Sequence, residues 1–458
     1  MTYVRTWIGI AFTAAVSGLV AFAVLPVDRA AAQPGAAGTP PQPAVGAVGC
    51  SGSACHGSPL RGDLPTSHWG TDVDRWKTSY EVWRHYDPHG RAYRVLTNEV
   101  SAKIEFLVAA GREPLKAWED ARCLACHSNP TLAAAWRDQP RHTEGVGCEA
   151  CHGNATHYLH DHIGWGSGPH RRAKFRAAGM TELFDPAVRA ETCAGCHVGA
   201  PGRDINHDLI AAGHPRLNFD YATYLRGLPP HWTEKDRTGE KATARPAGEI
   251  AHHWLVGRAA TAAASCELLA ARASDMAAPW PELSEFDCYT CHHNLRPAGF
   301  RDRVPNYSAD RRPGSLFWNE PVFAKELTDL AGAAALKTSH AALRVRMSGG
   351  DRDAVAKAAK AAAADWRAAA SAWANGPPMT PAQIATALQP AKVQRWDDAA
   401  HGYYALRALD AARGAADDPD LASLRDALRL PRPGHNSPID FDPVKTPFDF
   451  RTWFGKRR

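Results

Sequence analysis

The sequence predicts a mainly α-helical protein with two dissimilar parts. All 11 cysteines lie between Cys50 and Cys291, where frequent Gly and Pro favour short helices joined by loops. From about Pro321 the chain is rich in Ala and other strong helix formers. Charged residues (22%) and aromatic residues (9%) exclude a disordered chain. The net charge of +5 is too small to predict nucleic-acid binding.

The first 32 residues have the pattern of an export signal. Arg5 precedes an uncharged run, Thr6 to Val27, and Ala30-Ala31-Ala32 offers a small-residue cleavage site. We therefore expect a periplasmic protein cleaved near Ala32. The uncharged run is also long enough to span a bilayer, so a retained membrane anchor is the alternative. Residues 33–49 are rich in Pro, Gly and Ala and are expected to form a linker.

Four pentapeptides share the pattern Cys-x-x-Cys-His, which is the attachment signature of c-type haem. In this chemistry the two thiols form thioethers with the porphyrin and the His binds the iron. Chance predicts about 0.01 such pentapeptides in a chain of this composition. Structural zinc and dithiol redox chemistry also use Cys-x-x-Cys, but neither needs a His after each second Cys. The four motifs are Cys123/Cys126/His127, Cys148/Cys151/His152, Cys193/Cys196/His197 and Cys288/Cys291/His292.

A fifth cluster, Cys50-Ser-Gly-Ser-Ala-Cys55-His56, has four residues between its cysteines. Its small insert can bulge and still present both thiols, so we expect a fifth haem c with His56 as the iron ligand. The alternative is a Cys50–Cys55 disulfide. The eleventh thiol, Cys266, lies on an apolar stripe of a predicted helix, Glu249 to Asp275, and is expected to be buried.

The second iron ligands are expected to be histidines. Beyond the signal only Met180, Met276, Met347 and Met379 remain, and none lies close to a haem motif. His/His ligation predicts low reduction potentials, because Met/His ligation raises them. By local context the main distal candidates are His89, His162 and His214, and the weaker ones are His68, His207, His231, His252 and His253.

Three features resemble the cytochrome c-554 family, multihaem cytochromes related to the tetrahaem electron acceptor of hydroxylamine oxidation. They are Glu144-Gly-Val-Gly-Cys148-Glu-Ala-Cys151-His152-Gly153, the upstream Trp followed by His89-x-x-Ala92, and the Asp161-His162 pair. The resemblance extends from about Cys50 to His214. It implies bis-His haems with distal ligands at His89, His162 and His214, and a five-coordinate haem at His127. The wide first motif, the long insert before His89 and the motif at Cys288 depart from the family pattern.

Residues 50–300 are therefore expected to form a pentahaem cytochrome c domain with sparse regular structure around the haem array. Short helices carry the motifs, residues 216–247 form a surface excursion, and Lys and Arg pair with haem propionates. Residues 301–430 are expected to form a haem-free helical bundle, and residues 431–458 an irregular tail. The predicted bundle helices are Phe323 to Met347, Ala354 to Ala374 and Ala391 to Ala412.

The function expected from these features is electron transfer between redox partners through closely spaced haems. The chain is expected to be an electron carrier rather than an enzyme, with a redox donor and acceptor such as a membrane quinol-oxidising or respiratory complex. One alternative is an oxidoreductase acting on a small nitrogen or sulfur compound at an open haem on His127, with His142 and His157 as candidate acid/base groups. Another is a subunit of a larger respiratory complex, docked through the helical region. No nucleic-acid partner is expected, and membrane contact only through an uncleaved N-terminal segment.

Overall fold

The computed structural model describes ten stretches of the chain. The chain divides into Met1–Ala31 and Ala32–Arg458, and every described residue belongs to the second unit. The predicted export signal, most of the predicted linker, His68 and His142 lie outside the described residues. The stretches are 44–59, 75–129, 143–166, 171–232, 248–288, 291–292, 316–330, 334–414, 419–428 and 449–457.

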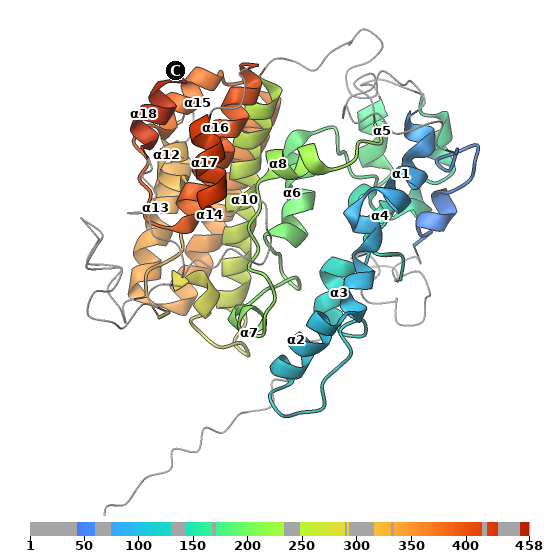
Figure 1. Cartoon of the computed structure of the whole chain (residues 1–458), viewed down its shortest axis with the longest axis horizontal. Coiled ribbons are helices and arrows are strands. Elements are labelled where there is room, and N and C mark those ends of the chain that lie inside the picture. The colour runs from blue at the N-terminus through green and yellow to red at the C-terminus, as the bar shows by residue number, and fades with distance from the viewer. Residues whose placement is uncertain are drawn as a thin grey trace, which may run out of the picture. The chain divides into compact units, whose positions relative to one another are not determined.

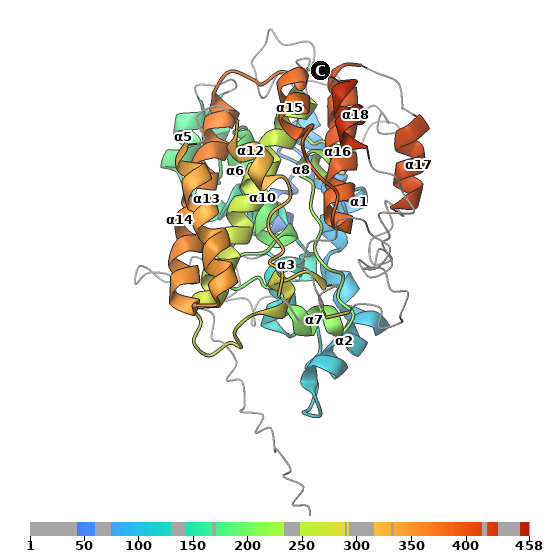
Figure 2. The same cartoon turned by 90° about the vertical axis from the view of Figure 1, so that its left-hand side faces the viewer.

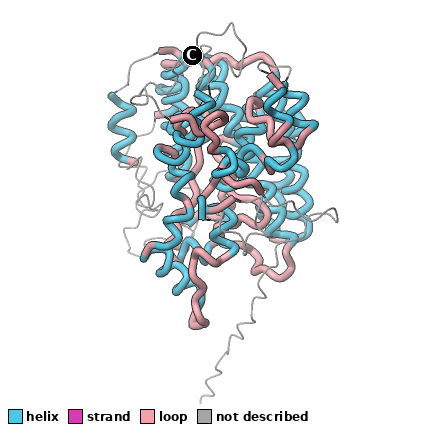
Figure 3. Tube along the Cα trace, turned by 90° about the vertical axis from the view of Figure 1, so that its right-hand side faces the viewer, coloured by secondary structure: helices cyan, strands magenta, loops and turns pink. Residues whose placement is uncertain are grey.

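Helices and loops make up the described part of the chain, which contains no strand (Figure 3). The predicted mainly α class is confirmed. Within this part of the chain, no helix combines the length and the apolar character needed to cross a bilayer.

The part that carries the first four motifs is built from short helices. Most begin at an Asp or Asn whose side chain accepts a backbone N–H of the first turn, as at Asp120 and Asp185. Such caps satisfy amides that have no partner inside the helix. The helices are α1 (Ser79–His85), α2 (Glu99–Ala109), α3 (Ala121–His127), α4 (Cys148–His152), α5 (Arg171–Ala177), α6 (Pro186–His197), α7 (His207–Ala211) and α8 (Tyr221–Gly227).

Longer helices form the second part, which Figures 1 and 2 show as a bundle. Its central pair is α10 (Glu249–Ser274) and α14 (Arg352–Asn375), which pack along each other with Leu255 and Trp366 fully buried. Cys266 on α10 is buried, as predicted. The remaining helices are α12 (Ala324–Thr328), α13 (Ala334–Gly349), α15 (Pro381–Leu388), α16 (Trp396–Ala412), α17 (Pro419–Ala427) and α18 (Phe450–Gly455).

Helix α10 lies within the predicted cytochrome domain and contacts both parts. It packs on α14 and α16 of the bundle and also on α6 and α8 of the motif-carrying part. The expected surface excursion at residues 216–247 is wrong at its start, because α8 is buried there. Tyr221, Ala222 and Leu225 form the apolar face of α8, and each is at most 6% exposed.

Both ends of the predicted fold are more ordered than expected. Residues 44–50, the end of the predicted linker, lie against the third motif, and Ala44 and Ala47 are buried. The end of the predicted irregular tail forms α18, which packs on α15 and α16 with Phe450 and Phe454 buried. Composition predicted loops in both places, but each contains apolar residues that the rest of the chain covers.

Close contact between α8 and α10 depends on the absence of a side chain at Gly257. A Cβ atom there would lie 2.4 Å from Cβ of Tyr221. We expect Gly257→Ala to lower the free energy of unfolding by about 1–3 kcal/mol, because overpacking forces buried groups apart. Thermal or urea unfolding followed by circular dichroism measures this change.

Gly349→Ala is the matched control, because nothing lies within 4 Å of a Cβ atom at the end of α13. This control is expected to be neutral or slightly stabilising, since Ala favours helix over Gly. Equal unfolding free energies for the two variants would contradict the packing described for α8 and α10.

Candidate functional site

Three of the Cys-x-x-Cys-His motifs form the last turn of a helix. Helices α3, α4 and α6 end at His127, His152 and His197 respectively. Residues three and four apart share one face of a helix, so the motif spacing places both thiols and the imidazole on the same side. The sequence pattern therefore produces a three-point attachment surface in each of these helices.

Numbered along the chain, the first motif is Cys50–His56 and the fifth motif is Cys288–His292. Both use turns instead of helices. After Cys50 the chain turns back through bonds from the Cys55 and Gly57 amides to the carbonyl of Gly52, 2.8 and 3.0 Å. A Cβ atom on Gly57 would lie 1.9 Å from the Ser51 carbonyl, so the bulged insert needs this glycine. In the fifth motif the amide of His292 donates to the carbonyl of Cys288 at 2.8 Å.

The thiols of Cys50 and Cys55 are free. The Cys50 thiol donates to the carbonyl oxygen of Gly46 at 3.9 Å and lies beside the Cys148 thiol of the third motif. The haem expected at the first motif stays a prediction.

Four motif histidines face a second histidine at nearly the same spacing. A metal ion bound by one imidazole nitrogen on each side, at about 2 Å from each, holds the two ring centres about 6 Å apart. The four pairs therefore have room for an iron between them. Their ring centroids are 6.2 Å apart for His56 and His162, 6.0 Å for His197 and His89, 6.2 Å for His152 and His231, and 6.3 Å for His292 and His207.

Hydrogen bonds at Nδ1 orient many of these rings. His56 Nδ1 lies 2.9 Å from the carbonyl oxygen of Trp76, and His162 Nδ1 lies 3.1 Å from that of Tyr158. Such a carbonyl accepts the Nδ1 proton and leaves the lone pair of Nε2 free for a metal. His89 uses the Asp87 carboxylate in the same way, at 2.8 Å.

Burial also keeps two of the motif imidazoles neutral, which is the form that binds a metal. At His89, burial is outweighed by the Asp87 carboxylate, which raises the pKa. Burial, with the charges of His231 and His56, lowers the pKa of His152 to about 3. Burial, with the charges of His89 and His127, lowers the pKa of His197 to about 4. The geometry and the protonation state of these groups therefore fit haem c.

His127 differs from the other motif histidines. Its Nδ1 lies 3.0 Å from the carbonyl oxygen of Ala92, and burial lowers its pKa, with a further contribution from the charge of His214. His214 therefore lies near it, held by its own Nδ1 at 2.8 Å from the carbonyl oxygen of Pro215. Among the described residues, however, no second histidine ring contacts the His127 ring. The five-coordinate haem expected at His127 stays a prediction.

Contacts between thiols of different motifs define which motifs are neighbours. Besides Cys50 and Cys148, Cys126 of the second motif and Cys196 of the fourth lie side by side, and each shifts the pKa of the other. Cys151 of the third motif lies close enough to the fourth for Cys193 and Cys196 to raise its pKa, although burial is the larger cause. The first four motifs therefore follow one another in space in the order first, third, fourth, second.

The segment of helix α7 connects the second motif to the fifth. It begins at His207, which faces His292, and two residues beyond its C-cap Ala212 the chain reaches His214, close to His127. Gly213 between them has a φ of 111°, a conformation that favours glycine.

Glu144 and Glu149 hold the first motif against the third. The Glu149 carboxylate accepts the amides of Val45 and Gly46 at 3.1 and 2.8 Å, and Glu144 accepts the amide of Ala47 at 2.7 Å. Sequence reasoning missed this role, because a carboxylate beside a motif does not reveal which distant backbone it binds.

The predicted distal candidates have different outcomes in the structure. His89, His162 and His207 each face a motif histidine, and His214 lies near His127. His231 was only a weak candidate, yet it faces His152. His253 instead contacts Tyr221, and its Nε2 lies 3.3 Å from Arg189. His68 is outside the described residues.

The described part of the chain is helical, and its repeated Cys and His motifs have the spacing that attachment of haem c requires. The family described as cytochrome c554 and c-prime matches residues 75–153, which contain His89 and the second and third motifs. This match supports a c554-like cytochrome with covalently bound haem c. No curated protein and no solved structure matches the chain.

The pairing of His152 with His231 is tested by removing the distal ring. We expect His231→Ala to convert one low-spin haem to a high-spin form, because the iron loses its sixth ligand. Low-temperature EPR of the ferric protein measures this change. The control is His160→Ala, an exposed histidine two residues before His162. An unchanged spectrum of the His231 variant, or the same high-spin signal in the control, would contradict the pairing.

Proposed function

We propose that this chain is an exported electron carrier with five covalently attached haems. The proposal rests on four histidine pairs whose ring spacing suits an iron ion between them. It also rests on the contacts that place the motifs one after another in space. Each haem c would supply a one-electron ferric/ferrous couple. The protein residues attach the haems, supply both axial nitrogens in at least four of them, and exclude water through the helices packed around the motifs.

The neighbouring motifs suggest one path for electrons, in the order first, third, fourth, second and fifth. His/His ligation and the scarcity of Met favour low potentials along this path. We propose that a redox protein, such as a periplasmic carrier or a membrane quinol-oxidising complex, exchanges electrons with the haem at each end of this path.

One observation favours a second candidate function. Among the described residues no histidine ring contacts the His127 ring, in contrast to the other four motif histidines. A haem-based oxidoreductase acting on a small nitrogen or sulfur compound would use this position.

The number of haems tests the proposed function directly. We expect the pyridine haemochrome assay to give five haems per chain, and four after the double substitution Cys288→Ser with Cys291→Ser or Cys50→Ser with Cys55→Ser. Cys266→Ser is the matched control. This variant should keep five haems, because Cys266 lies on α10 with its thiol buried in the core. Four haems in the unmodified chain, with no loss from the Cys50/Cys55 variant, would show that the first cluster binds no haem.

Carbon monoxide separates the two candidate functions. We expect the ferrous protein to bind it at one haem per chain, the haem on His127, because the other four motif histidines have a facing histidine. Optical titration with carbon monoxide measures the stoichiometry. Turnover of nitrite, hydroxylamine or a sulfur oxyanion at that haem would favour the oxidoreductase. No binding at all would exclude it, and binding at several haems would contradict the histidine pairs.

A further inference from the structure

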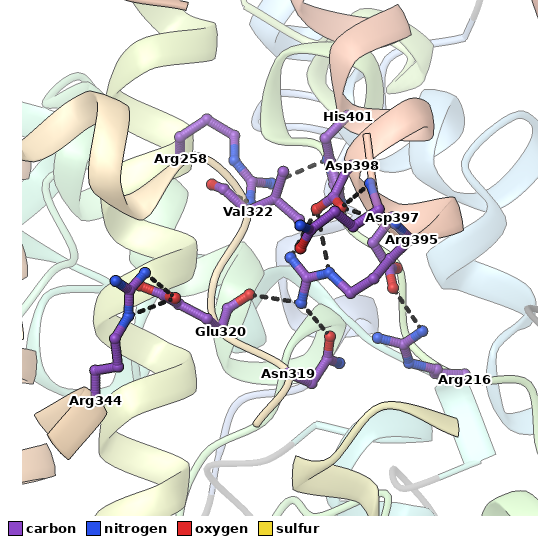
Figure 4. A network of polar contacts seen from close by, with 11 residues as sticks. Arg216, Arg258, Asn319, Glu320, Val322, Arg344, Arg395, Asp397, Asp398 and His401 are labelled. Carbon is purple, nitrogen blue, oxygen red and sulfur yellow. Dashed lines mark hydrogen bonds and ion pairs between the residues drawn. The ribbon is translucent and has the colours of Figure 1, made fainter. Parts of the chain in front are cut away.

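A network of mostly buried charged side chains joins the helical bundle to Arg216, whose side chain is 26% exposed (Figure 4). At its centre is the first turn of α16, where Asp397 and Asp398 are 8% and 7% exposed. Three guanidinium groups surround this turn: those of Arg216, Arg258 and Arg395. Charges are rarely buried unless each one has a partner, so the presence of five such groups calls for an explanation.

The two groups nearest the motif are Arg216 and Asp397. Arg216 Nη1 donates to Asp397 Oδ2 at 2.8 Å, and Arg216 follows His214 by two residues. Both charges act on the thiol of Cys288. Burial raises the pKa of this thiol, Arg216 lowers it, and Asp397 raises it. The ion pair therefore lies within electrostatic range of the atom that attaches the fifth haem.

Backbone bonds fix the motif segment relative to the network. The amide of Asp287 donates to the carbonyl of Phe317 at 2.8 Å, and the amide of Asn319 donates to that of Glu285 at 2.7 Å. The side chain of Asn319 in turn accepts from Arg395 Nη1 at 2.5 Å. The segment that carries Cys288 and the first turn of α16 therefore share one anchor.

The rest of the network is joined by hydrogen bonds between side chains. Arg395 donates to Asp398 Oδ1 from Nε and Nη2, at 3.2 and 2.7 Å. Arg258 Nη1 lies 3.0 Å from Nδ1 of His401. Burial and the charge of Arg258 hold the pKa of His401 well below its usual value, so this ring is neutral. The carboxylates of Asp220 and Asp287 act on these arginines in addition to those of Asp397 and Asp398.

We propose that the Arg216–Asp397 pair sets the reduction potential of the haem attached to Cys288 and Cys291, its two charges acting in opposite directions. This inference rests on the proposed function, since it requires a haem at the fifth motif. Both residues are positioning and electrostatic groups, and neither is an iron ligand. The helical bundle, which carries no haem motif, thereby controls one haem of the path.

The signs follow from electrostatics. Reduction adds a negative charge to the haem, so a nearby cation raises its potential and a nearby anion lowers it. Burial opposes ionisation of Asp397, but Arg216, Arg395 and Arg258 together lower its pKa. Arg395 and Arg258 still act on Asp397 when Arg216 is replaced, and both favour its ionised form.

The test is a spectroelectrochemical titration of the full-length holoprotein and its variants. Arg216→Gln should lower the midpoint of the fifth haem, and Asp397→Asn should raise it. At a fixed applied potential, each change should alter the oxidised-to-reduced ratio about threefold to tenfold; a tenfold change corresponds to about 59 mV for a one-electron couple. The double variant Arg216→Gln with Asp397→Asn should lie close to the unmodified protein.

Two further variants complete the experiment. The redox transition that is missing from the titration of the Cys288→Ser/Cys291→Ser protein belongs to the fifth haem. Five haems in that variant would refute the proposed function instead. The control Asp410→Asn breaks another buried pair of α16, with Arg457 at 2.6 Å, and should leave the midpoint unchanged.

Shifts of the same sign in both single variants would overturn the inference, because loosened packing would explain them. So would an unchanged midpoint, or an equal shift in the Asp410 control. Each single substitution has its own expected sign, so the two single variants, each with a full set of haems, together decide.

Discussion

The spacing between facing imidazole rings is the constraint on which the rest of the structure depends. Four motif histidines hold a second ring 6.0–6.3 Å away, and hydrogen bonds at Nδ1 orient several of these rings. The distal rings lie far from their partners in the sequence. Each pair therefore fixes the relative position of two distant segments, and the short helices and turns between them follow from that requirement.

Helix α10 connects the motif-carrying part to the rest of the described structure by packing on both. It packs on α6, which ends at His197, and on the bundle helices α14 and α16. The bundle is thus continuous with the motif-carrying part, and its charged face reaches the segment of Cys288. A haem-free region can hold charges near a haem in the protein interior. Charges interact more strongly there than in water, because the effective dielectric constant is lower.

The features that could be predicted from the sequence are those that depend on the spacing of residues close together in the chain. The Cys-x-x-Cys-His motifs, the long helices and the burial of Cys266 all follow from periodicity over a few residues. His231 was only a weak candidate, because a lone histidine is more often an ordinary surface or hydrogen-bonding residue, and its pairing with His152 depends on the fold. The Arg216–Asp397 pair could not be predicted, since nothing in either local sequence points to the other residue.

The most direct test of the central claim is an anomalous difference map at the iron absorption edge from crystals of the holoprotein. The account predicts five iron peaks per chain, four of them between the histidine pairs, in the order of the first, third, fourth, second and fifth motifs. Four peaks, or a peak beside His152 without His231 on its other side, would contradict it.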